Sequence, residues 1–159
     1  MAEHKSTVLL AHHLKQLKLP TMLREYSAVA AVCGRENRSF ETFLLRLCER
    51  ELVERQQRAT ERRIKAAKYP ALKTTESFDF AVQPSINEAL IRELRSGEFI
   101  DRRENVLLIG NSGTGKTHLA TALGLAACQE GRKVRFFGVT SLVTRLLESE
   151  RVPKNWALV

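Results

Sequence analysis

The sequence predicts a protein of the α/β class, in which a basic α-helical domain at residues 1–72 precedes the first half of a parallel α/β domain at residues 73–150. Three observations support this prediction. Apolar residues recur at helical spacing in the first domain, together with an excess of positive charge. Two short apolar runs flank a long helical segment in the second domain, which is the order of a parallel strand–helix–strand unit. The first of these runs ends in a glycine-rich loop.

Positive charge is concentrated in the first part of the chain. Residues 1–73 hold 15 Lys and Arg against 8 Asp and Glu, whereas residues 74–159 hold 11 against 10. A basic domain joined to a nearly neutral one indicates a polyanionic partner, and duplex DNA is the partner we expect. The alternative is a solvated helical surface, because runs of charge are common on exposed helices.

The cysteines and the apolar runs indicate the compartment. Three cysteines lie far apart without a CxxC pair, which favours free thiols in a reducing environment over a disulfide framework. The first residues lack the apolar core of a signal peptide, and the longest apolar run is too short to span a bilayer. We therefore expect a cytoplasmic protein without membrane contact.

Two helices are expected in the first half of the basic domain, before Gly34. The first has its apolar residues on one face, at Leu10, Leu14 and Leu17. It ends at Pro20, because proline cannot continue a helix. The second is expected over residues 21–32, with Gly34 as its stop.

A third helix is expected after Ser39, whose hydroxyl can cap it. Its apolar stripe comprises Phe40, Phe43, Leu44, Leu47 and Cys48. Beyond residue 53 the helix becomes strongly charged, and three acid–base pairs fall at i,i+4: Glu51–Arg55, Glu54–Arg58 and Glu61–Lys65. These pairs are typical of an exposed helix. The basic residues outnumber the glutamates, and the candidates for DNA phosphate contacts are Arg50, Arg55, Arg58, Arg62, Arg63, Lys65 and Lys68.

The second domain follows a break at Tyr69-Pro70 and an extended connector. Ser85 and Glu88 form a capping box that predicts a short helix ending at Gly97. Strands are expected at residues 106–109 and 134–137. The intervening helix is expected over residues 116–129 with Gly131 as its stop, and Ser141 is expected to cap a last helix that runs through Glu148.

The loop between the first expected strand and the following helix carries the strongest signal. Its sequence matches GxxxxGK[ST] at every fixed position, with Gly110, Asn111, Ser112, Gly113, Thr114, Gly115, Lys116 and Thr117. Gly113 and Gly115 permit backbone conformations that turn successive N–H groups towards phosphates. The Lys116 ammonium can reach the β- and γ-phosphates, and the Thr117 hydroxyl can ligate Mg²⁺. The loop therefore predicts an ATP site with Mg²⁺.

The residues around this loop closely resemble the IstB-type helper ATPases of insertion-sequence transposons, which are related to the DnaC helicase loaders. The resemblance rests on "ENVLLIGNSGTGKTHLATALGLAACQEGRKVRFFGVTSLVTRLLE", on "FDFAVQPSINEALIRELRSGEFI" and on "LKLPTMLREY". It implies a DNA-contacting helical domain before an AAA+ ATPase core, self-assembly on DNA, and a transposase as partner. His118 follows the family pattern "GKTHLA" and is placed beside the site without a catalytic role. Asn111-Ser112 replaces the Pro-Pro common in AAA+ loops, which removes no phosphate ligand.

The groups that hydrolysis requires are missing from the pattern. The resemblance implies a later strand that ends in Asp-Glu, then a polar sensor and an arginine finger. The two aspartates, Asp79 and Asp101, precede the loop, and the acids after Thr117 are Glu130, Glu148 and Glu150. The resemblance fades after Glu150, and we expect residues 151–159 to form a tail that does not match the family. We therefore expect a truncated copy without catalytic residues, which binds ATP without hydrolysing it.

Two alternatives remain at this point. A DnaC-like helicase loader would share the loop and differ in its partner. A non-enzymatic remnant would bind DNA or interfere with oligomers, and the missing carboxylates favour it for this chain.

Overall fold

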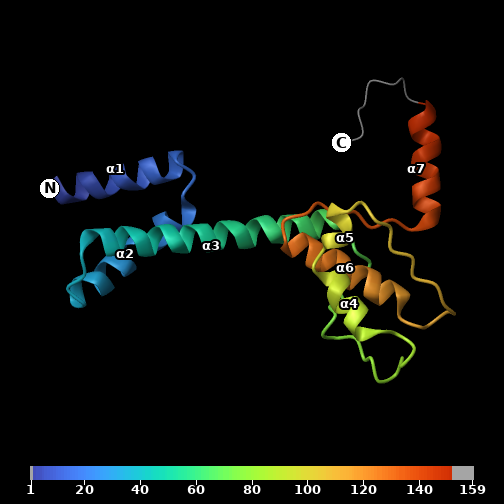
Figure 1. The fold of residues 1–159 in the computed structure, drawn as a ribbon. Coiled ribbons are helices and arrows are strands. Elements are labelled where there is room, and N and C mark those ends of the chain that lie inside the picture. The colour runs from blue at the N-terminus through green and yellow to red at the C-terminus, as the bar shows by residue number, and fades with distance from the viewer. Residues whose placement is uncertain (1, 152–159) are drawn as a thin grey trace. The chain divides into compact units, whose positions relative to one another are not determined.

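The computed structural model describes residues 2–151 (Figure 1). The chain folds into two compact units, Met1–Ala59 and Thr60–Val159. The helices are α1 (Ala2–Gln16), α2 (Pro20–Arg35), α3 (Phe40–Ala67), α4 (Glu88–Arg95), α5 (Glu98–Asp101), α6 (Lys116–Gln129) and α7 (Val139–Arg151). The predicted domain boundary after residue 72 stays a prediction. The predicted tail at 151–159 lies, apart from its first residue, outside the described residues.

The first unit packs α2 against the first half of α3. Its buried cluster consists of Val29, Cys33 and Leu47. Met22, Tyr26 and Phe43 pack against this cluster and are partly buried. The apolar stripe predicted for α3 is therefore correct at Phe43 and Leu47. It is wrong at Phe40 and Leu44, which are 90% and 56% exposed, because the cluster involves only one side of the helix.

Helix α2 spans Pro20–Arg35, where the prediction gave residues 21–32, and α1 ends at Gln16 rather than at Pro20. Pro20 occupies its first turn, where the missing N–H costs no helical hydrogen bond. Gly34 was predicted to stop the helix, but it lies inside it. Asn37 instead adopts the left-handed conformation with φ 50°, and the Arg38 N–H donates to the Cys33 carbonyl at 2.9 Å. Asparagine tolerates this conformation better than most residues, so it can close a helix in place of glycine.

The N-terminus of α2 is capped by a side chain from α3. The Glu51 carboxylate accepts hydrogen bonds from the N–H groups of Thr21 at 2.8 Å and Met22 at 3.1 Å. Arg55 and Arg58 lie within 3.4 Å and 3.3 Å of the same carboxylate. Burial alone would raise the pKa of Glu51, but these N–H donors and guanidinium charges outweigh it and lower that pKa. Glu51 therefore fixes α2 on α3 as a buried anion.

Replacing Glu51 with alanine is expected to destabilise the first unit by about 3 kcal/mol, because it leaves buried donors without an acceptor. Glu54→Ala is the matched control, since Glu54 is 39% exposed and its ion pair with Arg24 is 3.5 Å long. Amide hydrogen exchange within α2 measures the difference. Because the folded pKa of Glu51 is lowered, its contribution is present above the ordinary carboxyl pKa and is lost as the pH falls through the folded pKa. Unchanged exchange in Glu51→Ala would contradict this account.

Helix α6 is the buried centre of the second unit. Most of its residues from Leu119 to Cys128 are buried, although its sequence has no pronounced apolar face. Arg63 donates to the Cys128 carbonyl at 2.9 Å, and the Tyr69 hydroxyl lies 3.7 Å from the Cys128 sulfur. A Cβ at Gly124 would meet that hydroxyl at 2.6 Å, so the close approach of Tyr69 requires glycine. Burial is the main cause that raises the pKa of the Tyr69 hydroxyl, and the contact with Cys128 raises it further.

Several predicted ends in the second unit are confirmed and others are corrected. Helix α6 has the predicted bounds, and Gly131 follows it with φ 96°. Asn87, rather than Ser85, caps α4 by accepting the Leu90 N–H at 3.2 Å. The short helix α5 was not predicted, because its four residues carry no apolar period. Ser141 lies inside α7, which begins two residues earlier.

The two predicted strands are not confirmed. Within residues 2–151, neither 106–109 nor 134–137 is a β-strand. A strand exists only through pairing with another strand, and in the described chain neither segment has one. Phe136 instead donates its N–H to the Ala67 carbonyl at the end of α3, at 2.8 Å. Leu107 and Ile109 are 81% and 91% exposed, so the α/β layer predicted for residues 73–150 is not formed here.

Candidate functional site

The glycine-rich loop has the backbone conformation that its sequence predicts. Gly113 and Gly115 adopt left-handed conformations, with φ 80° and 84°. Gly115 is the residue before the first turn of α6, and no side chain caps that helix. The first N–H groups of a helix have no partner within it, and they attract anions when no side chain caps them. The loop therefore presents the start of α6 as an anion-binding end.

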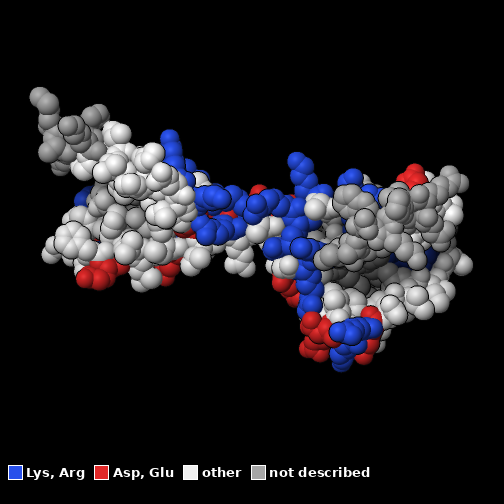
Figure 2. Space-filling view, turned by 90° about the horizontal axis from the view of Figure 1, so that it is seen from above, with Lys and Arg blue, Asp and Glu red and all other residues white. Residues whose placement is uncertain are grey.

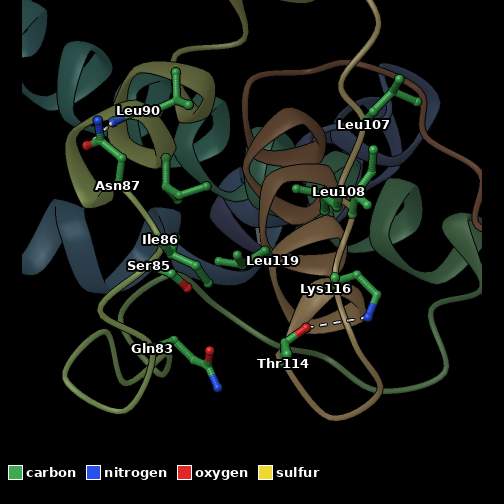
Figure 3. Close-up of a pocket in the computed structure, with 13 residues that line it drawn as sticks. Gln83, Ser85, Ile86, Asn87, Leu90, Leu107, Leu108, Thr114, Lys116 and Leu119 are labelled. Atoms are coloured by element: carbon green, nitrogen blue, oxygen red, sulfur yellow. Dashed lines mark hydrogen bonds between the residues drawn. The ribbon is translucent and has the colours of Figure 1, made fainter.

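Lys116 is held against the loop. Its Nζ donates to the Asn111 carbonyl at 2.5 Å and lies 3.4 Å from the Thr114 hydroxyl. The Thr114 hydroxyl donates to the same carbonyl at 2.9 Å. Figure 3 shows the Lys116 and Thr114 side chains turned towards each other at the loop. A phosphate that enters the loop must replace the Asn111 carbonyl as the acceptor for the Lys116 ammonium.

The remaining loop residues are open to solvent or have free space around them. Asn111, Ser112 and Thr117 are exposed, and a Cβ on Gly113 would meet nothing within 4 Å. Thr117 follows Lys116 in the first turn of α6, where its hydroxyl is available to a metal ion bound to phosphate. Among the side chains that the structure describes, no three of His, Cys, Asp or Glu come together as a metal site.

His118 contacts the connector that precedes the site. Its Nε2 lies 2.9 Å from the Thr74 carbonyl and 3.1 Å from the Ser77 hydroxyl. Its ring also meets Phe78 edge to face, with centroids 5.1 Å apart. The structure thus gives His118 a positioning role: it ties the connector to the first turn of α6.

Phe78 is a site residue that the sequence analysis missed. A Cβ added to Gly115 would collide with its ring, with Cζ at 3.0 Å, so the ring lies directly on the loop. Phe78 also packs on Phe80, with ring centroids 4.9 Å apart. The signal for this contact was present as two phenylalanines in an otherwise polar connector. Where the Phe78 ring packs depends on contacts between residues far apart in the sequence, which residue spacing alone does not reveal.

A hollow of about 280 Å³ adjoins the loop. The loop contributes Gly110, Thr114 and Lys116 to its wall. Its other walls are largely apolar and include Ile86, Leu90, Ile91, Leu107, Leu108, Ile109 and Leu119. Gln83 and Asn87 add amide groups. Figure 3 shows these side chains around the hollow, with Lys116 and Thr114 on the loop side.

The basic residues predicted to contact DNA divide into two groups. Four of them make contacts that support the fold. Arg50 pairs with Glu25 at 2.6 Å, and Arg55 donates to the Lys18 carbonyl at 3.0 Å. Arg58 contacts Thr21 and Glu51 at 3.3 Å, and Arg63 donates to the Cys128 carbonyl. Arg62, Lys65 and Lys68 are exposed at or just after the end of α3. Figure 2 shows Lys and Arg side chains gathered over α3.

Glu130, the first acid after the loop, lies far from it. Glu130 ends α6, about 20 Å along the helix from Lys116 at 1.5 Å per residue. It faces Arg132, at 3.8 Å. Glu148 lies on α7. Asp101, which precedes the loop, forms two 2.7 Å contacts with the Arg132 guanidinium, and these contacts lower its pKa.

Comparison with known proteins assigns the family. Residues 12–155 match the family model described as IstB-like ATP binding protein. The chain belongs to this family. The predicted resemblance to IstB-type proteins is therefore confirmed, and ATP is the ligand in the family's name. Within residues 2–151, no helix is both long enough and apolar enough to cross a bilayer.

Several curated relatives of this IstB-like chain are named as ATP-binding proteins of insertion sequences. An insertion sequence IS5376 protein of Geobacillus stearothermophilus, named for ATP binding, is 43% identical over 139 residues, which cover 87% of this chain and 55% of the relative. The IS21 counterpart of Pseudomonas aeruginosa is 36% identical over 87% of this chain and 52% of its own length. A Mycobacterium tuberculosis relative is 36% identical over 92% of this chain and 58% of its own length. The chain spans about half the length of the relatives it matches.

Proposed function

We propose that this IstB-like chain binds ATP with Mg²⁺ at residues 110–117 and serves as a DNA-associated helper of the transposase of its element. One observation carries the nucleotide part. Gly113 and Gly115 adopt left-handed conformations immediately before a helix whose first turn has no side-chain cap. This arrangement turns backbone donors towards an anion.

The loop residues divide the task of holding the triphosphate. Backbone N–H groups at the start of α6 bind the phosphate oxygens. The Lys116 ammonium leaves the Asn111 carbonyl and binds the β- and γ-phosphates, and the Thr117 hydroxyl ligates Mg²⁺. The adjoining 280 Å³ hollow supplies an apolar wall for the base, with the Gln83 amide at its edge.

Binding without hydrolysis is the activity that this chain supports by itself. Mg²⁺-dependent hydrolysis requires carboxylates that hold the metal and orient water. Glu130 lies at the far end of α6 from the loop. The alternative partner, a replicative helicase, would use the same loop, and the transposase is favoured because the relatives are named as insertion-sequence proteins.

A glycine substitution tests the nucleotide site. Gly115→Ala is expected to weaken ATP affinity by about tenfold or more, because a non-glycine residue in this conformation costs on the order of 1–3 kcal/mol and its Cβ collides with Phe78. Gly34→Ala is the matched control, because a Cβ there meets nothing within 4 Å and alanine favours the helix. Titration with a fluorescent ATP analogue and Mg²⁺ measures both. Equal affinity in the two variants would overturn the proposed site.

A further inference from the structure

A second hollow in the second unit, of about 360 Å³, is lined by three cationic side chains. They are Lys68, just after α3, Arg135 in the segment before α7, and Arg145 on α7. The Phe137 ring and Ser141 complete the part of the wall that concerns a ligand. The sequence analysis included only Lys68 among its candidates.

The two arginines are held in place around one aromatic ring. The Arg135 guanidinium lies 5.7 Å from the Phe137 ring centroid, and the Arg145 guanidinium lies 5.5 Å from it. Arg135 also donates to the Ala66 carbonyl at 2.8 Å. Because both guanidinium groups lie within 5.7 Å of the same ring centroid, the two positive charges are held near each other on one aromatic side chain. The arrangement is preorganised for a negatively charged group.

The described acidic side chains do not pair with the three cations of the hollow. Among residues 6–148, whose side chains the structure describes, no ion pair joins a carboxylate to Lys68, Arg135 or Arg145. Ser141 lies in the first turn of α7 and adds a hydroxyl that can donate a hydrogen bond. Three cations, a hydroxyl and a helix N-terminus together match the chemistry of a phosphate group.

We propose that this hollow binds a backbone phosphate of duplex DNA. DNA is favoured over a free nucleotide because Lys68 continues a line of exposed basic residues, Arg62 and Lys65, on the last turns of α3. Further cations therefore lie beside the hollow along the surface of α3, where they can contact the neighbouring phosphates of a polymer such as DNA. This inference rests on the DNA part of the proposed function and changes its residues: Arg135 and Arg145 join Lys68, whereas Arg63 supports the fold.

The test is fluorescence anisotropy of a labelled duplex of mixed sequence with the full chain at several salt concentrations. Arg135→Gln and Arg145→Gln are each expected to weaken binding about tenfold, and the slope of log K against log salt falls by about 0.9 for each phosphate contact removed. Lys133→Gln is the matched control. It removes the same charge from an exposed position in the same segment, and it does not line the hollow. The control is expected to stay within about twofold of the wild type.

Three other outcomes would overturn the inference. If the wild type does not bind duplex DNA at all, both the DNA role and this inference are overturned. If the wild type binds but all three variants change duplex affinity equally, only the net positive charge of the protein matters, and the hollow is not a phosphate site. If the hollow variants lose ATP affinity but keep duplex affinity, the hollow takes a free phosphate and the inference is wrong. Unchanged ATP affinity with selective loss of duplex binding is the expected result.

Discussion

Lys116→Ala is expected to weaken ATP affinity by between tenfold and a hundredfold. Charge-assisted hydrogen bonds to phosphate contribute about 1.5–3 kcal/mol each, and the ammonium can make more than one. Part of this gain is offset, because the ammonium must first leave the Asn111 carbonyl, to which it donates at 2.5 Å. The variant therefore loses phosphate contacts, but it also no longer has to break that hydrogen bond.

The measurement is a titration with a fluorescent ATP analogue in the presence of Mg²⁺. Lys133→Ala, an exposed lysine after α6, controls for the loss of charge. Lys116→Arg is a second comparison, since it keeps the charge but presents a planar fork in place of a compact ammonium. ATP should also raise the unfolding temperature of the wild type more than that of Lys116→Ala. Identical affinities for wild type and Lys116→Ala would contradict the role assigned to the lysine.

The second large effect is an expected absence of turnover by this chain. Three acids of the second unit are either engaged in other contacts or distant from the loop. Asp101 pairs with Arg132, and Asp79 accepts the Ala81 N–H at 3.0 Å. Glu130 lies at the end of α6 opposite Lys116. Lys116 and Thr117 can hold the phosphates and the metal ion, but they leave the attacking water without a base.

Phosphate release from purified protein, with and without duplex DNA, measures this turnover. We expect none that depends on Lys116. Lys116→Ala serves as the control, because release that persists in this variant comes from a contaminating enzyme. Lys116-dependent release at about 1 s⁻¹ or faster, the lower end for typical enzymes, would show that this chain completes a catalytic site.

Features set by neighbouring residues were predictable from the sequence. The glycines at 113 and 115 and the bounds of α6 follow from a strong local pattern, and the structure confirms them. Ser39 was also identified correctly, since its hydroxyl accepts the Thr42 N–H at 3.3 Å. In each case the partners lie within a few residues of each other, so spacing alone predicts the contact.

Features that depend on distant partners were not predictable. The cap of α2 comes from Glu51, thirty positions beyond Thr21, and the contact of Phe78 with the loop spans a similar separation. Strand formation at 106–109 requires a pairing partner, which apolar content cannot supply. The basic residues show the same limit. The sequence identifies them as a cationic group, but only three-dimensional contacts show that Arg58 and Arg63 are used within the fold.

The most direct test of the central claim is the identity of the nucleotide that the protein retains. The full chain is incubated with ATP and Mg²⁺, separated rapidly from free nucleotide, and denatured so that the bound nucleotide can be analysed. The account predicts intact ATP, about one per chain, and much less with Lys116→Ala. Recovery of ADP that forms only when Lys116 is present, or recovery of no nucleotide from the wild type, would contradict it.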